Sequence, residues 1–255
     1  MRKLFTVIIA LVAFTQGTMA LEYEPEPGFS AMGFIGMNAT KINNLGYDGK
    51  VGGVFGFRMD YVLPKAHGTY MTAGIDWTMK GAKLGGIQTL LTDGRTPDAT
   101  DKYCLNYLEI PVRVGFRYNF SKELGVFGEF GPYFAMGITG KHKFDVDADG
   151  PAARAGELVF REGTKQSYNA FKKKTFASDG VTPADPNFQR WDAGLGFRVG
   201  AEYNQHYSLM LGCDWGLTDM WLDDWRDAAY GKPGFNVADS KIKNFNFTIA
   251  FGYRF

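Results

Sequence analysis

The chain has 255 residues, with 28 Lys plus Arg against 27 Asp plus Glu, and its formal net charge is only +1. This balance excludes the strongly basic surface that nucleic-acid binding requires, so no nucleic-acid partner is expected. The composition is rich in Gly (33), Phe (22) and Tyr (13). Glycine leaves room inside a narrow barrel, and aromatic residues form girdles at membrane interfaces.

The N-terminus predicts a secretory signal peptide over residues 1–20. Arg2 and Lys3 supply the positive charge, Leu4–Phe14 the apolar core, and small residues end at Ala20. That core is too short to cross a bilayer as a helix, and no later apolar run reaches roughly 18 residues. Transmembrane helices are therefore excluded. The periplasm, the medium and an outer-membrane barrel remain as destinations.

A short acidic lead-in is expected at 21–27, followed by segments that alternate between large apolar and small or polar residues. This period of two is typical of β-strands with two different faces. The last segment shows it best, because every odd position from Phe245 to Phe255 is aromatic or aliphatic. The predicted strands are 29–38, 50–62, 69–80, 103–118, 124–138, 191–203, 207–217 and 245–255.

The connections between these segments alternate in length. The long ones are 39–49, 81–102, 139–188 and 217–242, and the short ones are 63–68, 119–123 and 204–206. Short periplasmic turns and longer outer loops are typical of transmembrane barrels. The sequence therefore predicts an all-β domain over 28–255, an eight-stranded antiparallel transmembrane β-barrel with up-and-down meander topology. A soluble barrel would have the opposite pattern, with its apolar face inside.

The face of each strand that carries the small residues also carries charges of both signs. A charge facing hydrocarbon costs about 2–4 kcal/mol at mid-membrane, so these side chains are expected to point inward and pair. Eight strands leave an interior just wide enough for side chains to fill. A salt-bridged plug is predicted, with a proton or ion path as the alternative. The residues of this lumen charge network are Arg58, Asp60, Asp76, Lys80, Glu109, Arg113, Arg117, Glu129, Asp192, Arg198, Glu202, Asp214 and Arg254.

Two further features concern the strand faces and the C-terminus. Cys104 and Cys213 fall on the apolar faces of strands that are not neighbours, so free thiols acting as small apolar groups are expected. Tyr253 and Phe255 give the last strand an aromatic end, which resembles the closing strand that the assembly machinery of outer-membrane barrels reads.

Several motifs resemble the PorT-like outer-membrane β-barrel family common in Bacteroidota. They are YLEIPVRVGFRY at 107–118, GVFGEFGPYFAMGI at 125–138, WDAGLGFRVGAEY at 191–203, GLTD at 216–219 and IAFGYRF at 249–255. The resemblance implies the barrel fold and the outer membrane, and it implies no activity. Pro111 and Pro132 lie within these motifs and lack an N–H, so bulges or unpaired positions are expected between the fourth and fifth strands.

The long outer loop at 140–189 contains a weak calcium-site candidate. Asp145, Asp147 and Asp149 before Gly150 match the opening of a calcium loop. The position that should supply a bidentate glutamate is Gly156, so a solvated acidic turn is the alternative. No other cofactor is expected.

Two other outer segments are candidates for surface contacts. Lys172, Lys173 and Lys174 lie between Phe171 and Phe176 and would suit lipopolysaccharide headgroups, or form an ordinary charged loop. The segment after the seventh strand combines tryptophans with acidic residues, which fits either glycan stacking or an interface girdle. These residues are Trp215, Asp219, Trp221, Asp223, Asp224, Trp225 and Asp227.

A lipid-modifying enzyme would need a nucleophile and a base at the outer rim. His67 and His206 fall in the short turns, and His142, the remaining histidine, has no serine motif near it. The predicted role is therefore structural or binding, through outer loops that contact a surface partner, a glycan or lipopolysaccharide. A small channel and a lipid-modifying enzyme are the alternatives.

Overall fold

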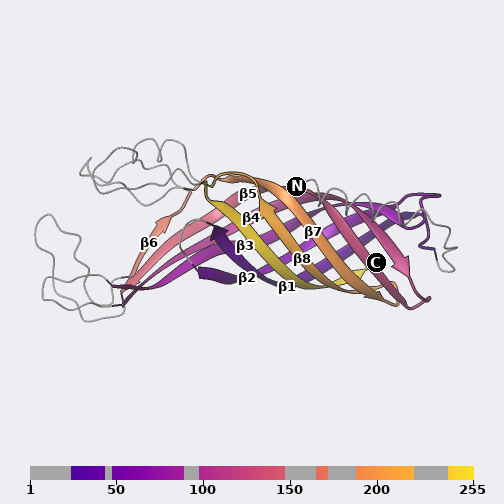
Figure 1. Ribbon diagram of the computed structural model, residues 1–255, viewed down its shortest axis with the longest axis horizontal. Helices are drawn as coiled ribbons and strands as arrows, with labels where there is room; N and C mark the ends of the chain where they lie inside the picture. Colours follow the sequence, from indigo (N-terminus) through magenta and orange to yellow (C-terminus); the bar gives the residue numbers. More distant parts are fainter. Residues whose placement is uncertain (1–23, 44–47, 89–97, 147–164, 172–187, 221–240) are drawn as a thin grey trace, which may run out of the picture.

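The computed structural model describes residues 24–43, 48–88, 98–146, 165–171, 188–220 and 241–255, and these residues form β-strands and turns (Figure 1). No helix in this part of the chain has the length and apolarity needed to cross a bilayer. The strands are β1 (Gly28–Asn43), β2 (Asp48–Val62), β3 (Thr69–Gln88), β4 (Asp98–Asn119), β5 (Leu124–Val146), β6 (Lys165–Asn169), β7 (Trp191–Tyr203), β8 (Tyr207–Gly216) and β9 (Lys243–Arg254).

Eight of these strands close into the predicted antiparallel barrel. Their order is β4-β3-β2-β1-β9-β8-β7-β5, and pairing of β4 with β5 closes the sheet. The first and last strands pair from Met32–Arg254 to Asn43–Lys243. Beyond them, the Phe255 amide donates to the Ala31 carbonyl at 2.8 Å. The fold class predicted from alternation is therefore confirmed.

The ninth strand, β6, was not predicted. It pairs with β5 at Lys141–Asp145, whereas β7 pairs with β5 only as far as Met136. β6 thus continues the edge of β5 beyond the end of β7 (Figure 1). The prediction of one continuous loop at 140–189 is wrong, because its start belongs to β5 and part of its middle is β6.

The strands on one side of the barrel extend far beyond the others. β3, β4 and β5 have 20, 22 and 23 residues, against 10 in β8 and 12 in β9. At about 3.3 Å per residue, β5 is about 75 Å long and β8 about 33 Å. The three long strands protrude together at the end opposite the short turns (Figure 1). We call this part, with β6, the outer extension.

The predicted outer ends of these strands were too short, and the connection between β1 and β2 shrinks to 44–47. Alternation between apolar and polar residues indicates a strand that has one face against hydrocarbon. Beyond the membrane the outward residues become polar, as at Lys83 and Lys143, while the inward ones are apolar or aromatic and buried, as at Ala82 and Tyr103. The pattern of apolar residues outward therefore ends although the backbone pairing continues.

Apolar side chains point outward and charged ones inward, as the alternation predicts. Ile35 is 67% exposed, Val114 54% and Phe251 51%, whereas Arg58 and Asp76 are each 1% exposed. This arrangement is the inverse of a water-soluble barrel and matches a barrel with hydrocarbon around it.

The pairing of β4 with β5 is interrupted next to the prolines. Partners run to Pro111–Tyr133 and resume at Val114–Phe130 in the same register. The unpaired positions agree with the expectation from Pro111 and Pro132, but the one register shift in this pair lies at Asn106, away from both prolines. Both cysteines, Cys104 on β4 and Cys213 on β8, are free.

Substitution of Leu211 by Arg, in the middle of the outward face of β8, is expected to destabilise the barrel by about 2–4 kcal/mol in lipid. The matched change Tyr207→Arg, on the same face at the short-turn end, should cost about 0–1 kcal/mol. Urea titration of each variant in lipid vesicles measures the difference. Equal losses at both positions would contradict the membrane orientation.

Candidate functional site: the filled lumen

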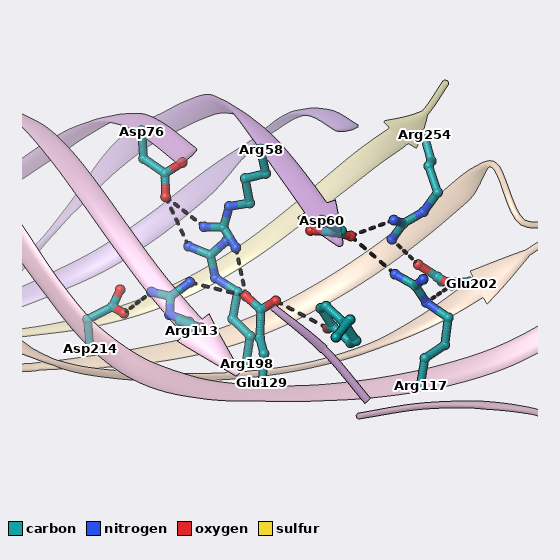
Figure 2. A network of polar contacts seen from close by, with 11 residues as sticks. Arg58, Asp60, Asp76, Arg113, Arg117, Glu129, Arg198, Glu202, Asp214 and Arg254 are labelled. Atoms are coloured by element: carbon teal, nitrogen blue, oxygen red, sulfur yellow. Dashed lines mark hydrogen bonds and ion pairs between the residues drawn. The ribbon is translucent and has the colours of Figure 1, made fainter. Parts of the chain in front are cut away.

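The lumen charges form layers, and the lowest lies beside the short turns. Asp60, Arg117, Glu202 and Arg254 come from β2, β4, β7 and β9. Asp60 accepts from Arg117 Nη2 at 3.2 Å and from Arg254 Nη1 (Figure 2). Glu202 accepts from Arg254 Nη2 and forms an ion pair with Arg117, whose Nε lies 2.8 Å from its carboxylate. Each carboxylate therefore bridges both guanidinium groups, and the ring of four is neutral.

The middle layer contains three cations and three carboxylates. Arg58 contacts Asp76 at 2.6 Å and Glu129 at 2.7 Å. Arg113 contacts Glu129 at 3.2 Å and Asp214 at 3.0 Å. Glu129 Oε1 thus contacts both arginines, as Figure 2 shows.

Aromatic rings complete the middle layer and join it to the lowest one. Arg198 approaches Asp76 at 3.5 Å, and its guanidinium lies 5.3 Å from the centre of the Phe34 ring. Tyr70 donates its hydroxyl to Glu129 at 3.2 Å while the Arg117 guanidinium lies 4.7 Å from the centre of its ring. Buried cations are stabilised by such rings as well as by carboxylates.

The upper layer is built around one lysine. Lys80 Nζ lies 3.2 Å from Glu109 and 3.0 Å from Asp192. Asp192 also accepts from the Tyr133 hydroxyl at 3.3 Å and the Asn244 amide at 3.0 Å. Two carboxylates therefore share one lysine in this layer. Asp192 also accepts hydrogen bonds from two neutral donors, Tyr133 and Asn244.

Glycines in the wall make room for these large side chains. A Cβ added at Gly196 would lie 2.6 Å from Arg113 Nη2, and one at Gly115 would lie 2.4 Å from the Tyr70 ring. Real Cβ atoms essentially never approach so closely. The high glycine content therefore reflects a lumen that is packed up to its wall.

An apolar cluster caps the outer end of this lumen. Segments between the strands take part, because Ala170 N donates to Gly140 O at 3.1 Å, Phe188 N to Ala170 O at 2.9 Å and Met220 N to Ile242 O at 2.9 Å. The cap consists of Ile42, Ala82, Tyr103, Leu105, Tyr107, Tyr133, Ala135, Ala170, Phe171, Phe188, Met220 and Ile242.

Sequence reasoning did not find the cap. Phe171 was named only as the aromatic residue before the candidate lysine segment 172–174, whereas its side chain is 5% exposed and packs in the cap. It lies against Gly137 and Gly140, whose added Cβ atoms would meet its ring at 2.4 and 2.7 Å. Single aromatic residues between strands have no periodic pattern, so no signal in the sequence marked Phe171, Phe188 or Met220.

Only one of the three aspartates of the calcium-site candidate, Asp145, lies within the described residues. Asp145 lies at the outer end of β5, opposite Thr100 and Lys165. Asp147 and Asp149 lie outside the described residues. Within the described residues, no group of three or more His, Cys, Asp or Glu side chains is arranged to hold a metal ion.

Of the other predicted surface residues, some lie within the described part of the chain and some lie outside it. Trp215 points outward from β8 with its ring 6.1 Å from that of Phe245, and Asp219 accepts from the Ile242 amide at 3.2 Å. At the barrel seam, Tyr253 and Phe255 are both exposed, with ring centroids 5.3 Å apart. The residues outside the described part are Lys172, Lys173, Lys174, Phe176, Trp221, Asp223, Asp224, Trp225 and Asp227.

The three histidines are far from forming one site. His67 and His206 lie in short turns, and His67 Nδ1 is 2.6 Å from a carboxylate oxygen of Glu24 in the lead-in. His142, the outer candidate for a catalytic base, is buried on β5 with its ring stacked 4.4 Å from that of Tyr103.

A double-mutant cycle on Arg113 and Asp214 tests the lumen network. Arg113→Met leaves Asp214 without its arginine and is expected to cost about 3–5 kcal/mol of unfolding free energy. Arg113→Met combined with Asp214→Asn removes the unpaired charge, so part of that loss should be recovered. Urea titration in lipid vesicles gives the coupling free energy. Additive losses would contradict a direct buried pair.

Comparison with known proteins places the chain in a family. A search of curated proteins gives no significant match. Among solved structures, the chain is similar to Ail, the attachment invasion locus protein of Yersinia pestis (14% identity, 90% of this chain and 100% of that chain, TM-score 0.34). It is also similar to OprG from Pseudomonas aeruginosa (12%, 91% and 98%, TM-score 0.38) and to Neisserial surface protein A (9%, 89% and 97%, TM-score 0.39).

These likenesses are too low in identity and TM-score to bear on the role of any residue. The family model described as "Outer membrane protein beta-barrel domain" matches residues 14–221. Because this match covers most of the chain, the protein belongs to the outer membrane protein beta-barrel domain family.

Proposed function

We propose that this protein is a closed, non-catalytic outer-membrane barrel that acts through its extracellular end, as a structural element and a binding surface. The observation that carries this proposal is the filled lumen. Arg58, Lys80 and Arg113 are each 1% exposed inside it, and the apolar cap lies above them. Because the interior of the barrel is filled, its outer surfaces are the part that we expect to bind a ligand.

The same observation argues against a channel or a proton path. An ion crossing the lumen would have to separate buried pairs in successive layers. Removing one partner of a buried pair typically costs about 3–5 kcal/mol. The layers are also linked, because Tyr70 contacts both Glu129 and Arg117. Opening one layer would therefore disturb the next.

The outer extension supports the proposed location of function. β3, β4 and β5 continue well past the strands on the far side, and β6 adds a further strand beside β5. Such an extension offers paired backbone and side chains outside the apolar belt of the barrel. A surface partner, a glycan or lipopolysaccharide is its expected ligand. A lipid-modifying enzyme has less support, because His142 is buried and its ring stacks on that of Tyr103.

Export and assembly complete the proposal. The signal peptide over residues 1–20 would direct export, and the barrel assembly machinery would read the aromatic end of β9 at Tyr253 and Phe255. Within the wider family, the motifs of 107–118 and 191–203 support a PorT-like member of Bacteroidota type.

Planar-bilayer recordings test the proposal. The wild-type barrel is expected to give no steady conductance, because its lumen is filled. The variant Arg58→Ala/Asp76→Ala/Arg113→Ala/Asp214→Ala removes two charges of each sign from the middle layer and leaves the lumen charge unchanged. It should also give no steady conductance, because the lowest ring, the Lys80 layer and the cap still close the lumen.

Folding of both proteins is checked by their gel mobility before and after boiling. Steady conductance from the folded wild type would overturn the proposal in favour of a channel. Lipid A whose mass differs between cells with and without the protein would instead favour an enzyme.

A further inference from the structure

A row of lysines crosses the outward face of the outer extension. Lys83 on β3 is the direct partner of Lys102 on β4, and Lys102 is the direct partner of Lys143 on β5. Lys83 and Lys143 are exposed and Lys102 is half-buried. Three cations therefore stand side by side on three neighbouring strands.

Two more lysines lie next to this row. Lys141 is the partner of Cys104. A register shift in β2 beyond Gly49 lets Lys50 cross the outer face, where its Nζ lies 3.1 Å from Cys104 Sγ. Bulges commonly re-aim a side chain in this way. We call the five residues Lys50, Lys83, Lys102, Lys141 and Lys143 the lysine patch.

The lysine patch differs from the lumen in the pairing of its charges. Within the described part of the chain, none of its ammonium groups lies within ion-pair distance of a carboxylate. Asp48 is the backbone partner of Lys83 but makes no ion pair with it. Like charges directly opposite each other destabilise a sheet, so this arrangement calls for an external anion.

The height of the lysine patch identifies the source of that anion. Among the residues of β3 up to Lys83, whose faces are described, Met79 is the last large apolar residue on the outward side, and Lys83 follows four residues later. That separation is about 13 Å along a tilted strand, which places the lysines at the level of the headgroups. On β4 and β5 the polar pair Asn106–Thr139, 2.8 Å apart, marks the same change from apolar to polar.

We propose that the lysine patch binds the phosphate groups of a phosphorylated outer-leaflet lipid. Lysine is a compact cation suited to phosphate, and five such groups on one face match a polyanionic headgroup. The inference rests on the membrane orientation of the proposed function and goes beyond it, since it assigns a ligand to the strand face instead of to the loops.

The test uses the full mature protein extracted from outer membranes and freed of lipid. Its unfolding temperature is measured by gel mobility in detergent with added bis-phosphorylated lipid A, and again with the same lipid A after dephosphorylation. The wild type should be stabilised by the phosphorylated form alone. In Lys102→Gln/Lys143→Gln the affinity for phosphorylated lipid A should fall roughly tenfold to thirtyfold.

The sign of the effect should reverse without phosphate. In dephosphorylated lipid A, Lys102→Gln/Lys143→Gln is expected to unfold at a higher temperature than the wild type, because the repulsion between partner strands is gone. Lys102→Arg/Lys143→Arg should retain binding. The control Lys65→Gln/Lys122→Gln changes the charge equally but lies in the short turns, so its affinity should match the wild type.

Equal stabilisation by both lipids, or an equal loss in the control variant, would overturn the lipid site. These outcomes are independent of the conductance test. A barrel that conducts ions but still binds phosphorylated lipid A would contradict the proposed function alone, and a silent barrel without lipid preference would contradict this inference alone.

Discussion

Backbone hydrogen bonding in a medium without water is the constraint on which the rest of the structure depends. Each strand that crosses hydrocarbon must pair its amides and carbonyls on both edges, so the sheet has to close on itself. Pairing of β4 with β5 and of β1 with β9 achieves this. Closure with eight strands leaves a narrow interior. Side chains that cannot face lipid must then fit together inside it.

The layers of the lumen follow from that confinement. A buried carboxylate or guanidinium without a partner is costly, so charges of opposite sign meet in compact groups and aromatic rings fill the space between them. Outside, the surface changes from apolar side chains to the lysine patch within a few residues. Within the described residues, the charged groups of the lumen form ion pairs with one another, whereas those of the lysine patch do not. We therefore assign a structural role to the lumen and a binding role to the lysine patch.

The sequence predicted the parts of the molecule that the hydrocarbon belt controls. Alternation located β7 at its observed bounds and turned Arg58 inward and Phe57 outward, because one face of each strand meets lipid. It missed β6 and the outer ends of β3, β4 and β5, where lysines replace the outward apolar residues and the pattern of a lipid-facing strand ends. It also missed Phe171 in the cap, since a single aromatic residue brought in by tertiary packing carries no period.

The inverted arrangement of faces is the central claim, and a gel of the unboiled protein tests it most directly. Cells expressing the full chain are fractionated, and the outer-membrane protein is run in detergent with and without boiling. A closed barrel with its apolar face outward resists the detergent, so the unboiled protein should sit in the outer-membrane fraction and migrate faster than the boiled one. A soluble protein whose mobility does not change on boiling would contradict the account.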